Sequence, residues 1–245
     1  MYFSSELDGL RVVLVAARNP LNIGAAARAM SNFGFSQLRL VNPYEVAFRE
    51  ARSAVGASEL MARAVEHENI AEAVADCTLV VGTTAVRHRE LQQPLRRLEV
   101  GARLIRSHLA SGGVALLFGS EKVGLSNRDL SHCHWLLRIP TCEANISMNL
   151  GQAVAVCLYE LVRDPMAVEK ATLTEPAAAG GVERITTCLL EALRASQYIK
   201  PRTTLATEDK VRRLVRRLRL SPSDAELVLG MLRQVLWKLR GAAKP

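Results

Sequence analysis

The chain has 245 residues, of which 49% are hydrophobic and 23% are charged, and its mean hydropathy is +0.09. This length and composition are sufficient to bury a sizeable core without disulfides, which excludes an intrinsically disordered protein. The longest apolar runs are far shorter than the roughly 20 residues that a bilayer requires, and the first residues do not resemble a signal peptide. We therefore expect a soluble, cytoplasmic protein of one large or two modest domains.

The positive charge is concentrated near the C-terminus. Residues 1–181 hold 18 Lys and Arg against 18 Asp and Glu, whereas residues 182–245 hold 14 against 6, so the net charge of +8 arises in the last quarter. A neutral body with a basic appendage favours a polyanionic partner, most simply a nucleic acid. A solvated basic face without a partner is the alternative.

Five cysteines, an odd number without a Cys-x-x-Cys pair, indicate a reducing compartment. The cluster His132-Cys133-His134 with Cys142 nearby does not have the spacing of a structural zinc site, so we expect no metal.

Short β-rich runs alternate with helix-period segments in the first two thirds of the chain. The expected strands are 11–17, 37–41, 79–83, 114–118 and 135–139, and the expected helices are 23–33, 57–75, 102–109 and 150–162. Four of the strands are nearly continuous apolar runs, as in strands that helices cover on both faces. This pattern predicts an α/β domain with a mostly parallel sheet, which ends before Asp164-Pro165.

A Gly/Pro-bearing segment of small residues follows this domain. We interpret residues 1–170 as the α/β domain, 171–181 as a linker, and 182–245 as a basic helical extension. The extension is expected to contain helices over 182–195, 207–218 and 221–239, the last beginning with Ser221 as N-cap and Pro222 in the first turn.

The ordinary nucleotide-binding fingerprints are absent, because neither Gly-x-Gly-x-x-Gly nor a Walker-type loop follows the first strand. Polar residues instead follow three of the strands. Asn22 and Arg28 lie in the helix after the first, Gly119 and Glu121 follow the fourth, and Ser147 and Asn149 precede the helix after the fifth. Because ligands bind outside the carboxyl ends of parallel strands, we expect the three clusters to meet in one cleft.

Each cluster taken alone has a structural alternative. Arg28 is either a cation for a phosphate or oxyanion, or a surface arginine in a salt bridge. The glycines around Glu121 are also compatible with a simple turn, and Ser147 and Asn149 are also good N-cap residues.

Taken together, the three segments resemble the three motifs of the SpoU class in the SPOUT superfamily of RNA ribose 2′-O-methyltransferases. The matching residues are Asn22-x-x-Ala-x-x-Arg28 closing on Phe33-Gly34, Phe118-Gly119-Ser120-Glu121-x-x-Gly124-Leu125, and Ile139-Pro140-Thr141 leading to Ser147-Met148-Asn149-Leu150. The resemblance spans about residues 8–165. Gly82-Thr83-Thr84-Ala85, Arg87-His88-Arg89 and the helical extension look most like the subgroup that methylates tRNA at the first anticodon-loop nucleotide, C/U32.

The resemblance implies a C-terminal trefoil knot in the α/β domain, an exception to the rule that chains avoid knots. It also implies a homodimer with each active site at the subunit interface, and S-adenosylmethionine as the methyl donor. On this interpretation the cofactor pocket is lined by Thr83, Thr84, Ala85, Gly119, Ile139, Ile146, Ser147 and Met148.

The same resemblance assigns the catalytic residues. Arg28 stabilises the developing 2′-oxyanion and positions the ribose, which we favour over proton abstraction because a guanidinium ordinarily keeps its proton. Asn22 and Glu121 orient Arg28 and the ribose, and Ser147 and Asn149 fix the site around the methyl group. Ser120 stands where the tRNA subgroup often has arginine, so a ribosomal RNA methyltransferase is an alternative, as is a non-catalytic RNA-binding protein of this fold.

Six basic residues lie within ten positions of the extension: Lys210, Arg212, Arg213, Arg216, Arg217 and Arg219. On a helix, Arg212, Arg213, Arg216 and Arg219 form a broad basic stripe opposite the apolar Val211, Leu214, Val215 and Leu218. We expect this stripe to bind RNA phosphates. The alternative is that nearby acidic residues neutralise it.

Overall fold

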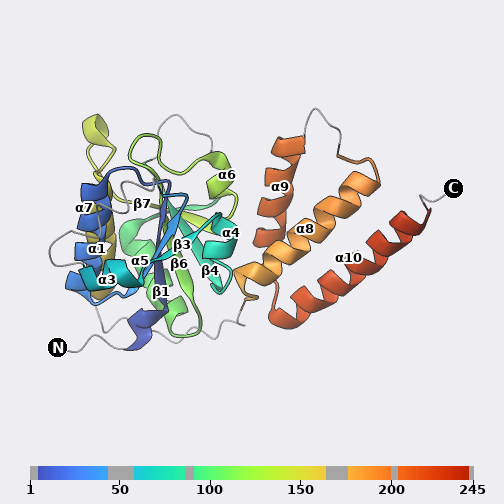
Figure 1. Cartoon of the computed structure of the whole chain (residues 1–245), viewed down its shortest axis with the longest axis horizontal. Coiled ribbons are helices and arrows are strands. Elements are labelled where there is room, and N and C mark those ends of the chain that lie inside the picture. The colour runs from blue at the N-terminus through green and yellow to red at the C-terminus, as the bar shows by residue number, and fades with distance from the viewer. Residues whose placement is uncertain (1–4, 44–57, 86–90, 164–175, 200–203, 243–245) are drawn as a thin grey trace.

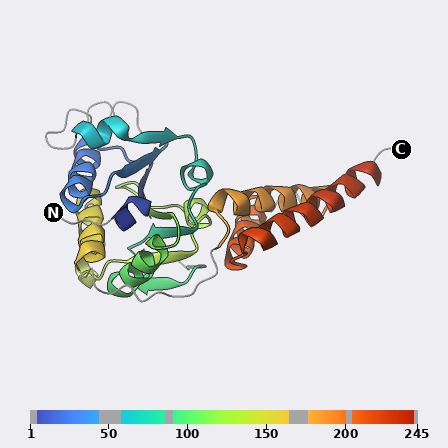
Figure 2. The ribbon, with the colours of Figure 1, turned by 90° about the horizontal axis from the view of Figure 1, so that it is seen from below.

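The computed structural model describes residues 5–43, 58–85, 91–163, 176–199 and 204–242. They form an α/β body and three C-terminal helices that project from one side of it (Figures 1 and 2). Arg87, His88, Arg89, Pro165 and the 171–175 part of the expected linker lie outside the described residues.

The body is built on a seven-stranded sheet with the strand order β3-β2-β1-β6-β4-β7-β5, and every pair of neighbouring strands is parallel. The predicted α/β class with a mostly parallel sheet is therefore confirmed. In chain order the strands are β1 (Leu10–Val15), β2 (Gln37–Val41), β3 (Val65–His67), β4 (Leu79–Thr83), β5 (Leu95–Arg97), β6 (Val114–Phe118) and β7 (Trp135–Arg138).

Helices and short 3₁₀ turns connect these strands. They are η1 (Ser5–Gly9), α1 (Pro20–Phe33), α3 (Ser58–Arg63), α4 (Ile70–Ala73), α5 (Leu98–Leu109), α6 (Asn127–Leu130), η2 (Glu143–Asn145) and α7 (Leu150–Val162). The prediction of one helix over 57–75 is wrong, because α3, the edge strand β3 and α4 occupy that segment, with Asn69 capping α4. The exposed edge strand β5 was not predicted, since Leu95-Arg96-Arg97 carries no apolar run.

Alternate residues of the central strands enter two separate apolar cores, as expected for a sheet with helices on both faces. Val12 and Leu14 of β1 belong to the core under α1, α5 and α7, whereas Val13 and Val15 belong to the core under α4 and α6. Because the sheet is covered on both faces, its carboxyl edge is where a site can open.

The C-terminal helices α8 (Ala179–Ala195), α9 (Thr204–Arg217) and α10 (Pro222–Ala242) have a core of their own. Helix α8 packs against both α9 and α10 and begins three residues earlier than predicted, inside the segment interpreted as a linker. The Ser221 hydroxyl accepts the Asp224 N–H at 3.1 Å, which confirms the predicted N-cap of α10. None of the described helices is long and apolar enough to cross a membrane.

We predict that Gly101→Ala destabilises the body although alanine favours helix. A Cβ at this position of α5 would lie 2.2 Å from Leu137 Cδ1 and 3.1 Å from the Trp135 ring, so we expect a loss of about 1–3 kcal/mol. The matched control is Gly230→Ala in α10, where a Cβ meets nothing within 4 Å and a gain of about 0.5–1 kcal/mol is expected. Urea denaturation measures both. A Gly101→Ala protein as stable as wild type would contradict the close packing of α5 on β7.

Candidate active site

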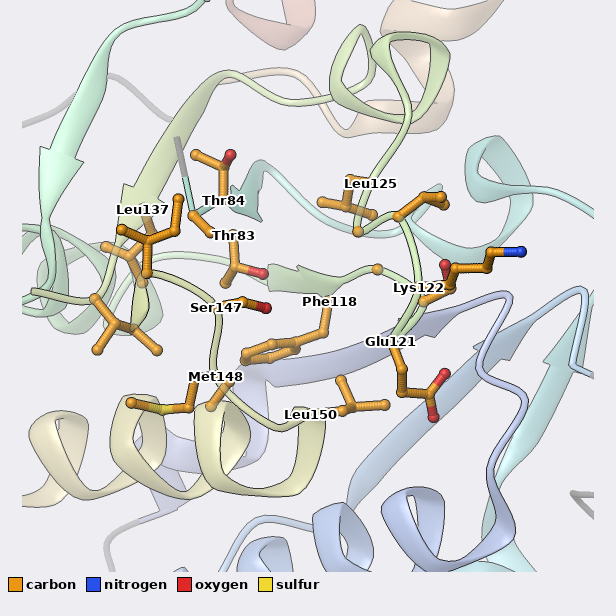
Figure 3. Close-up of a pocket in the computed structure, with 18 of the residues that line it drawn as sticks. Thr83, Thr84, Phe118, Glu121, Lys122, Leu125, Leu137, Ser147, Met148 and Leu150 are labelled. Atoms are coloured by element: carbon orange, nitrogen blue, oxygen red, sulfur yellow. The ribbon is translucent and has the colours of Figure 1, made fainter. Parts of the chain in front are cut away.

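A pocket of about 320 Å³ opens at the carboxyl edge of the sheet, where the chain leaves β4, β6 and β7 (Figure 3). The segments that form it come from three separate parts of the chain. Two carry the expected clusters after β6 and before α7, and the third follows β4, whereas Asn22 and Arg28, after β1, do not line the pocket. The lining residues are Thr83, Thr84, Ala85, Phe118, Gly119, Ser120, Glu121, Lys122, Val123, Gly124, Leu125, Leu137, Ile139, Thr141, Ile146, Ser147, Met148, Leu150 and Ala153.

All eight residues assigned to a cofactor on the basis of the resemblance are among them. Among the others, Glu121 was predicted as catalytic, and Phe118 and Leu150 belong to the quoted motifs without a predicted role. Lys122 and Leu137 were not singled out, and their only signal in the sequence is that each lies beside a residue of a motif segment or at a strand end.

The loop after β6 folds back on itself over one side of the pocket. Ser120 pairs with Gly124, whose N–H donates to the Ser120 carbonyl at 2.8 Å. A Cβ on Gly119 would lie 2.0 Å from the Gly124 carbonyl carbon, and Gly124 itself has φ +69°. The backbone therefore requires glycine at both positions. The segment is a turn, as one of the two interpretations of the sequence had it, and this turn also lines the pocket.

Hydrogen bonds fix the other two pocket segments. The Thr83 hydroxyl donates to the Leu117 carbonyl at 2.9 Å, and the Thr84 N–H donates to the Leu137 carbonyl at 3.0 Å. The Thr141 hydroxyl donates to the Ile146 carbonyl at 3.3 Å, across the 3₁₀ turn η2. These hydrogen bonds fix the backbone around the pocket, and both polar and apolar side chains line its space.

A chain of hydrogen bonds connects three of the predicted catalytic residues. Asn149 Oδ1 accepts the N–H groups of Gly151 and Gln152 and caps α7, and Asn149 Nδ2 donates to Asn22 Oδ1 at 2.8 Å. Asn22 Nδ2 in turn donates to Glu121 Oε1 at 2.9 Å. Both proposed roles of Asn149 therefore coexist, because the residue is an N-cap and also part of the site.

Glu121 receives three hydrogen bonds on its carboxylate: one from Asn22 and two from the backbone N–H groups of Arg18 and Asn19, each at 3.2 Å. Partial burial raises the pKa of this carboxyl, but the hydrogen bonds outweigh burial and hold its pKa below the ordinary value. The ionised form therefore contributes stability that is present above the ordinary pKa and is lost as the pH falls through the lowered pKa.

Arg28 does not join this group. It lies on the exposed side of α1, does not line the pocket of its own chain, and forms no ion pair with any described residue. The salt-bridge alternative therefore has no described partner, and within this chain Asn22 and Glu121 hydrogen-bond each other. Ser147, by contrast, lies inside the pocket beside the Phe118 ring (Figure 3).

The predicted basic stripe on α9 is wrong in its orientation. Arg216 is 2% exposed and Arg212 is largely covered, whereas Leu214 and Leu218, assigned to the apolar side, are 48% and 54% exposed. The reason is Glu183 of α8, which provides a counter-charge for both arginines. Lys210, Arg217 and Arg219 are exposed and Arg213 is half-buried, so these four remain available to a polyanion.

The His132-Cys133-His134 segment has structural contacts. His134 Nδ1 accepts the Val80 N–H at 3.0 Å, and Cys133 is buried in the core beneath α6. Within the described ranges no group of three or more His, Cys, Asp or Glu residues is arranged to hold a metal ion.

Comparisons with known proteins agree with the resemblance. The model of the SpoU rRNA Methylase family matches residues 9–159. The chain is 35% identical over 238 residues to the tRNA (cytidine/uridine-2′-O-)-methyltransferase TrmJ of Sodalis glossinidius, covering 94% of this chain and 92% of that protein. It is 34% identical over 249 residues to the tRNA (cytidine/uridine/adenosine-2′-O-)-methyltransferase TrmJ of Pseudomonas aeruginosa, covering 96% of each. The crystal structure of TrmJ from Z. mobilis superposes with a TM-score of 0.81 at 31% identity, covering 92% of this chain and 98% of that one.

We predict that Asn22→Ala raises the pKa of Glu121, because the substitution removes the side-chain hydrogen bond that stabilises the ionised carboxylate. NMR titration of the Glu121 carboxyl carbon measures the shift. The matched control is Asn69→Ala, which removes another asparagine whose side-chain amide donates to a glutamate, here Glu72, and leaves Glu121 untouched. An unchanged Glu121 titration in Asn22→Ala would show that the backbone donors alone set its pKa.

Proposed function

Since the chain belongs to the SpoU rRNA methylase family, we propose that this methyltransferase binds S-adenosylmethionine in the strand-end pocket and methylates a ribose 2′-hydroxyl of tRNA, at the first anticodon-loop nucleotide C/U32. The observation that carries the proposal is that all eight residues assigned to the cofactor line one pocket, which the second and third motif segments form together with the segment after β4. The names of the relatives support tRNA as the substrate over ribosomal RNA.

The pocket fits this cofactor in its chemistry. Ile139, Ile146 and Met148 offer apolar surface to a nucleoside, and Gly119, where no side chain fits, allows its close approach to the backbone. Such a pocket needs no helix N-terminus for a pyrophosphate, because the cofactor has none. When bound, the cofactor supplies an electrophilic methyl group on its sulfonium.

The protein has to orient the 2′-hydroxyl and stabilise the oxyanion that forms as its proton leaves. We assign the stabilising charge to Arg28, whose guanidinium offers several N–H donors. Ser147, inside the pocket, positions the ribose near the methyl group. Asn22, Glu121 and Asn149 hold these segments together through their hydrogen-bond chain, and are positioning residues.

Arg28 and the pocket belong together only if a second chain is present. The guanidinium lies on an exposed face of α1 and outside the pocket of its own chain. We therefore infer a homodimer in which each chain places Arg28 at the pocket of its partner. The trefoil knot and a cytoplasmic location remain part of the proposal, the latter supported by five unpaired cysteines.

The function is tested by methyl transfer from labelled S-adenosylmethionine to total tRNA and to ribosomal RNA from cells that lack the gene. We expect label in tRNA, and we expect mapping of the 2′-O-methyl groups to locate them at C/U32. Label found only in ribosomal RNA would show that ribosomal RNA, and not tRNA, is the substrate. This is the alternative raised by Ser120, which stands where the tRNA subgroup often has arginine. RNA binding without any transfer would favour the non-catalytic alternative.

The assignment of Arg28 is tested by mixing two inactive variants. Arg28→Ala removes the guanidinium and leaves the pocket intact, and Thr83→Trp fills the pocket and leaves Arg28 intact. If Arg28 acts across the interface, mixed dimers contain one complete site, and an equal mixture regains about a quarter of wild-type turnover.

Two controls accompany the mixing experiment. Each variant alone stays inactive, and Arg28→Ala still binds the cofactor by calorimetry. No recovery on mixing, with exchange of subunits verified, would place Arg28 in its own chain's site. Wild-type turnover of Arg28→Ala alone would remove it from the mechanism.

A further inference from the structure

A cluster of charged side chains lies where the C-terminal helices meet the α/β body, near α6 and α9 in Figure 1. Glu183 of α8 is at its centre. Arg212 Nε lies 3.3 Å from Glu183 Oε1, and Arg216 Nη2 lies 3.5 Å from Glu183 Oε2. On the side of the body, His132 Nδ1 lies 3.9 Å from Glu183 Oε2, and the Ser131 hydroxyl accepts Arg212 Nη1 at 3.4 Å. The cluster thus spans both parts of the chain.

Burial makes this cluster sensitive to the loss of one charge. The Arg216 side chain is 1% exposed, and none of its three guanidinium nitrogens has a hydrogen-bond partner among the described residues. Glu183 and Asp209 balance the charges of Arg212 and Arg216, since Asp209 Oδ1 lies 3.5 Å from Arg212 Nη1. Removing one member of a buried pair is strongly destabilising, because the remaining charge stays without compensation.

Two backbone hydrogen bonds fix the start of α8 to the body. The Ala179 N–H donates to the Cys77 carbonyl at 2.6 Å, and the Gly180 N–H donates to the Ala75 carbonyl at 2.8 Å. These bonds, together with the burial of Ala179 in the core beneath α4, attach the start of α8 to the body. The charged cluster is a second attachment, which joins α8 and α9 to the body at Ser131 and His132.

We propose that Glu183 is a positioning residue for RNA methylation: its carboxylate holds Arg212 and Arg216 of α9 at the α6–β7 corner and so fixes the exposed cations of the C-terminal helices relative to the pocket. The role in RNA methylation rests on the proposed function, whereas the docking itself does not. Two arginines predicted to bind RNA therefore act inside the protein, and orient the cations that remain outside.

The neutral state of His132 is part of this arrangement. Burial, followed by the charges of Arg216, Arg212 and Arg128, lowers the pKa of His132 to about 2. The charged or titratable groups around it are Arg128, Asp129, Cys133 and His134 on its own segment, Glu183 on α8, and Asp209, Arg212 and Arg216 on α9. A protonated His132 would add a third buried positive charge against one adjacent carboxylate.

The docked state therefore binds fewer protons than an undocked state, in which His132 would titrate near its ordinary pKa of about 6.5. Docking is unaffected by pH above that value and weakens below it. Between pH 7.5 and 5.5 the ratio of docked to undocked protein is expected to fall about tenfold.

The test uses the full-length protein and the substitution Glu183→Gln, which keeps the shape and removes the charge. Small-angle X-ray scattering should show a larger maximum dimension, and the KM for tRNA should rise at least about tenfold with the Kd for S-adenosylmethionine unchanged. The matched control is Glu191→Gln on the same helix, which breaks the exposed pair with Arg240 inside the extension and should change neither measurement.

Unchanged scattering and an unchanged tRNA KM in Glu183→Gln would overturn the proposal, and so would an equal loss of cofactor binding, which would indicate a general structural role.

A second variant, Glu183→Met with Arg212→Met and Arg216→Met, replaces the charges by apolar groups of similar size. We expect it to dock, and to bind tRNA as wild type does. A docked triple variant with a raised tRNA KM would mean that the arginines contact RNA themselves.

Should Glu183→Gln fail to fold, the triple variant decides the question. Wild-type scattering together with a wild-type KM for tRNA supports arginines that act inside the protein, and wild-type scattering with a raised KM for tRNA overturns the proposal. Because scattering needs no substrate, failure of docking is distinguishable from failure of the proposed function. If docking holds but no RNA is methylated, only the proposed activity fails.

Discussion

The arrangement of the site depends on one amide, the side chain of Asn149. Its oxygen is committed to the first turn of α7, where it accepts two backbone N–H groups, so its nitrogen must face Asn22. That choice orients the Asn22 amide with its oxygen toward Asn149 and its nitrogen toward Glu121. A single helix cap thereby sets the donor-to-acceptor direction of the hydrogen bonds that join α7, α1 and the loop after β6. Glu121 is the end of that chain, and its three donors stabilise the ionised form of the carboxylate.

The sequence was informative where local chemistry and burial point the same way. The strands β4 and β6 are apolar on both faces and β2 is apolar on one, and the residues of all three are those predicted. Part of the pocket was also predictable, because parallel strands bring their carboxyl ends to one edge, and the motif residues that follow β6 and β7 line the pocket there. The prediction failed over 57–75, where a helix-period pattern spans α3, β3 and α4. Edge strands such as β3 and β5 are short and polar, so they leave no periodic signal.

The charged residues of α9 show a different limit. Helical geometry correctly places Arg212 and Arg216 on one side, but it does not say which side faces the protein. That choice was made by Glu183, which lies 29 and 33 residues earlier in the chain and is buried with its partners. An apolar stripe of Val211 and Val215 packs inward as expected, while Leu214 and Leu218 stay exposed. Charge pairing between helices therefore outweighed the local apolar pattern. The free-energy cost of a buried arginine without a carboxylate is larger than the cost of leaving a leucine side chain exposed to water.

The packing of α9 divides the positive charge of the C-terminal helices into a buried part and an exposed part. The excess of +8 in the last quarter of the sequence is not one uniform surface, since part of it is neutralised within the protein by Glu183, Asp209 and Glu191. The cations left on the surface, among them Lys210 and Arg217, are carried by the same helix as the buried ones. A helix that uses one face for attachment and the other for a polyanion cannot change its attachment without moving its binding surface. On the proposed function, affinity for RNA and the orientation of the helical unit are therefore coupled through α9, and a substitution on one face of this helix is expected to change what the other face does.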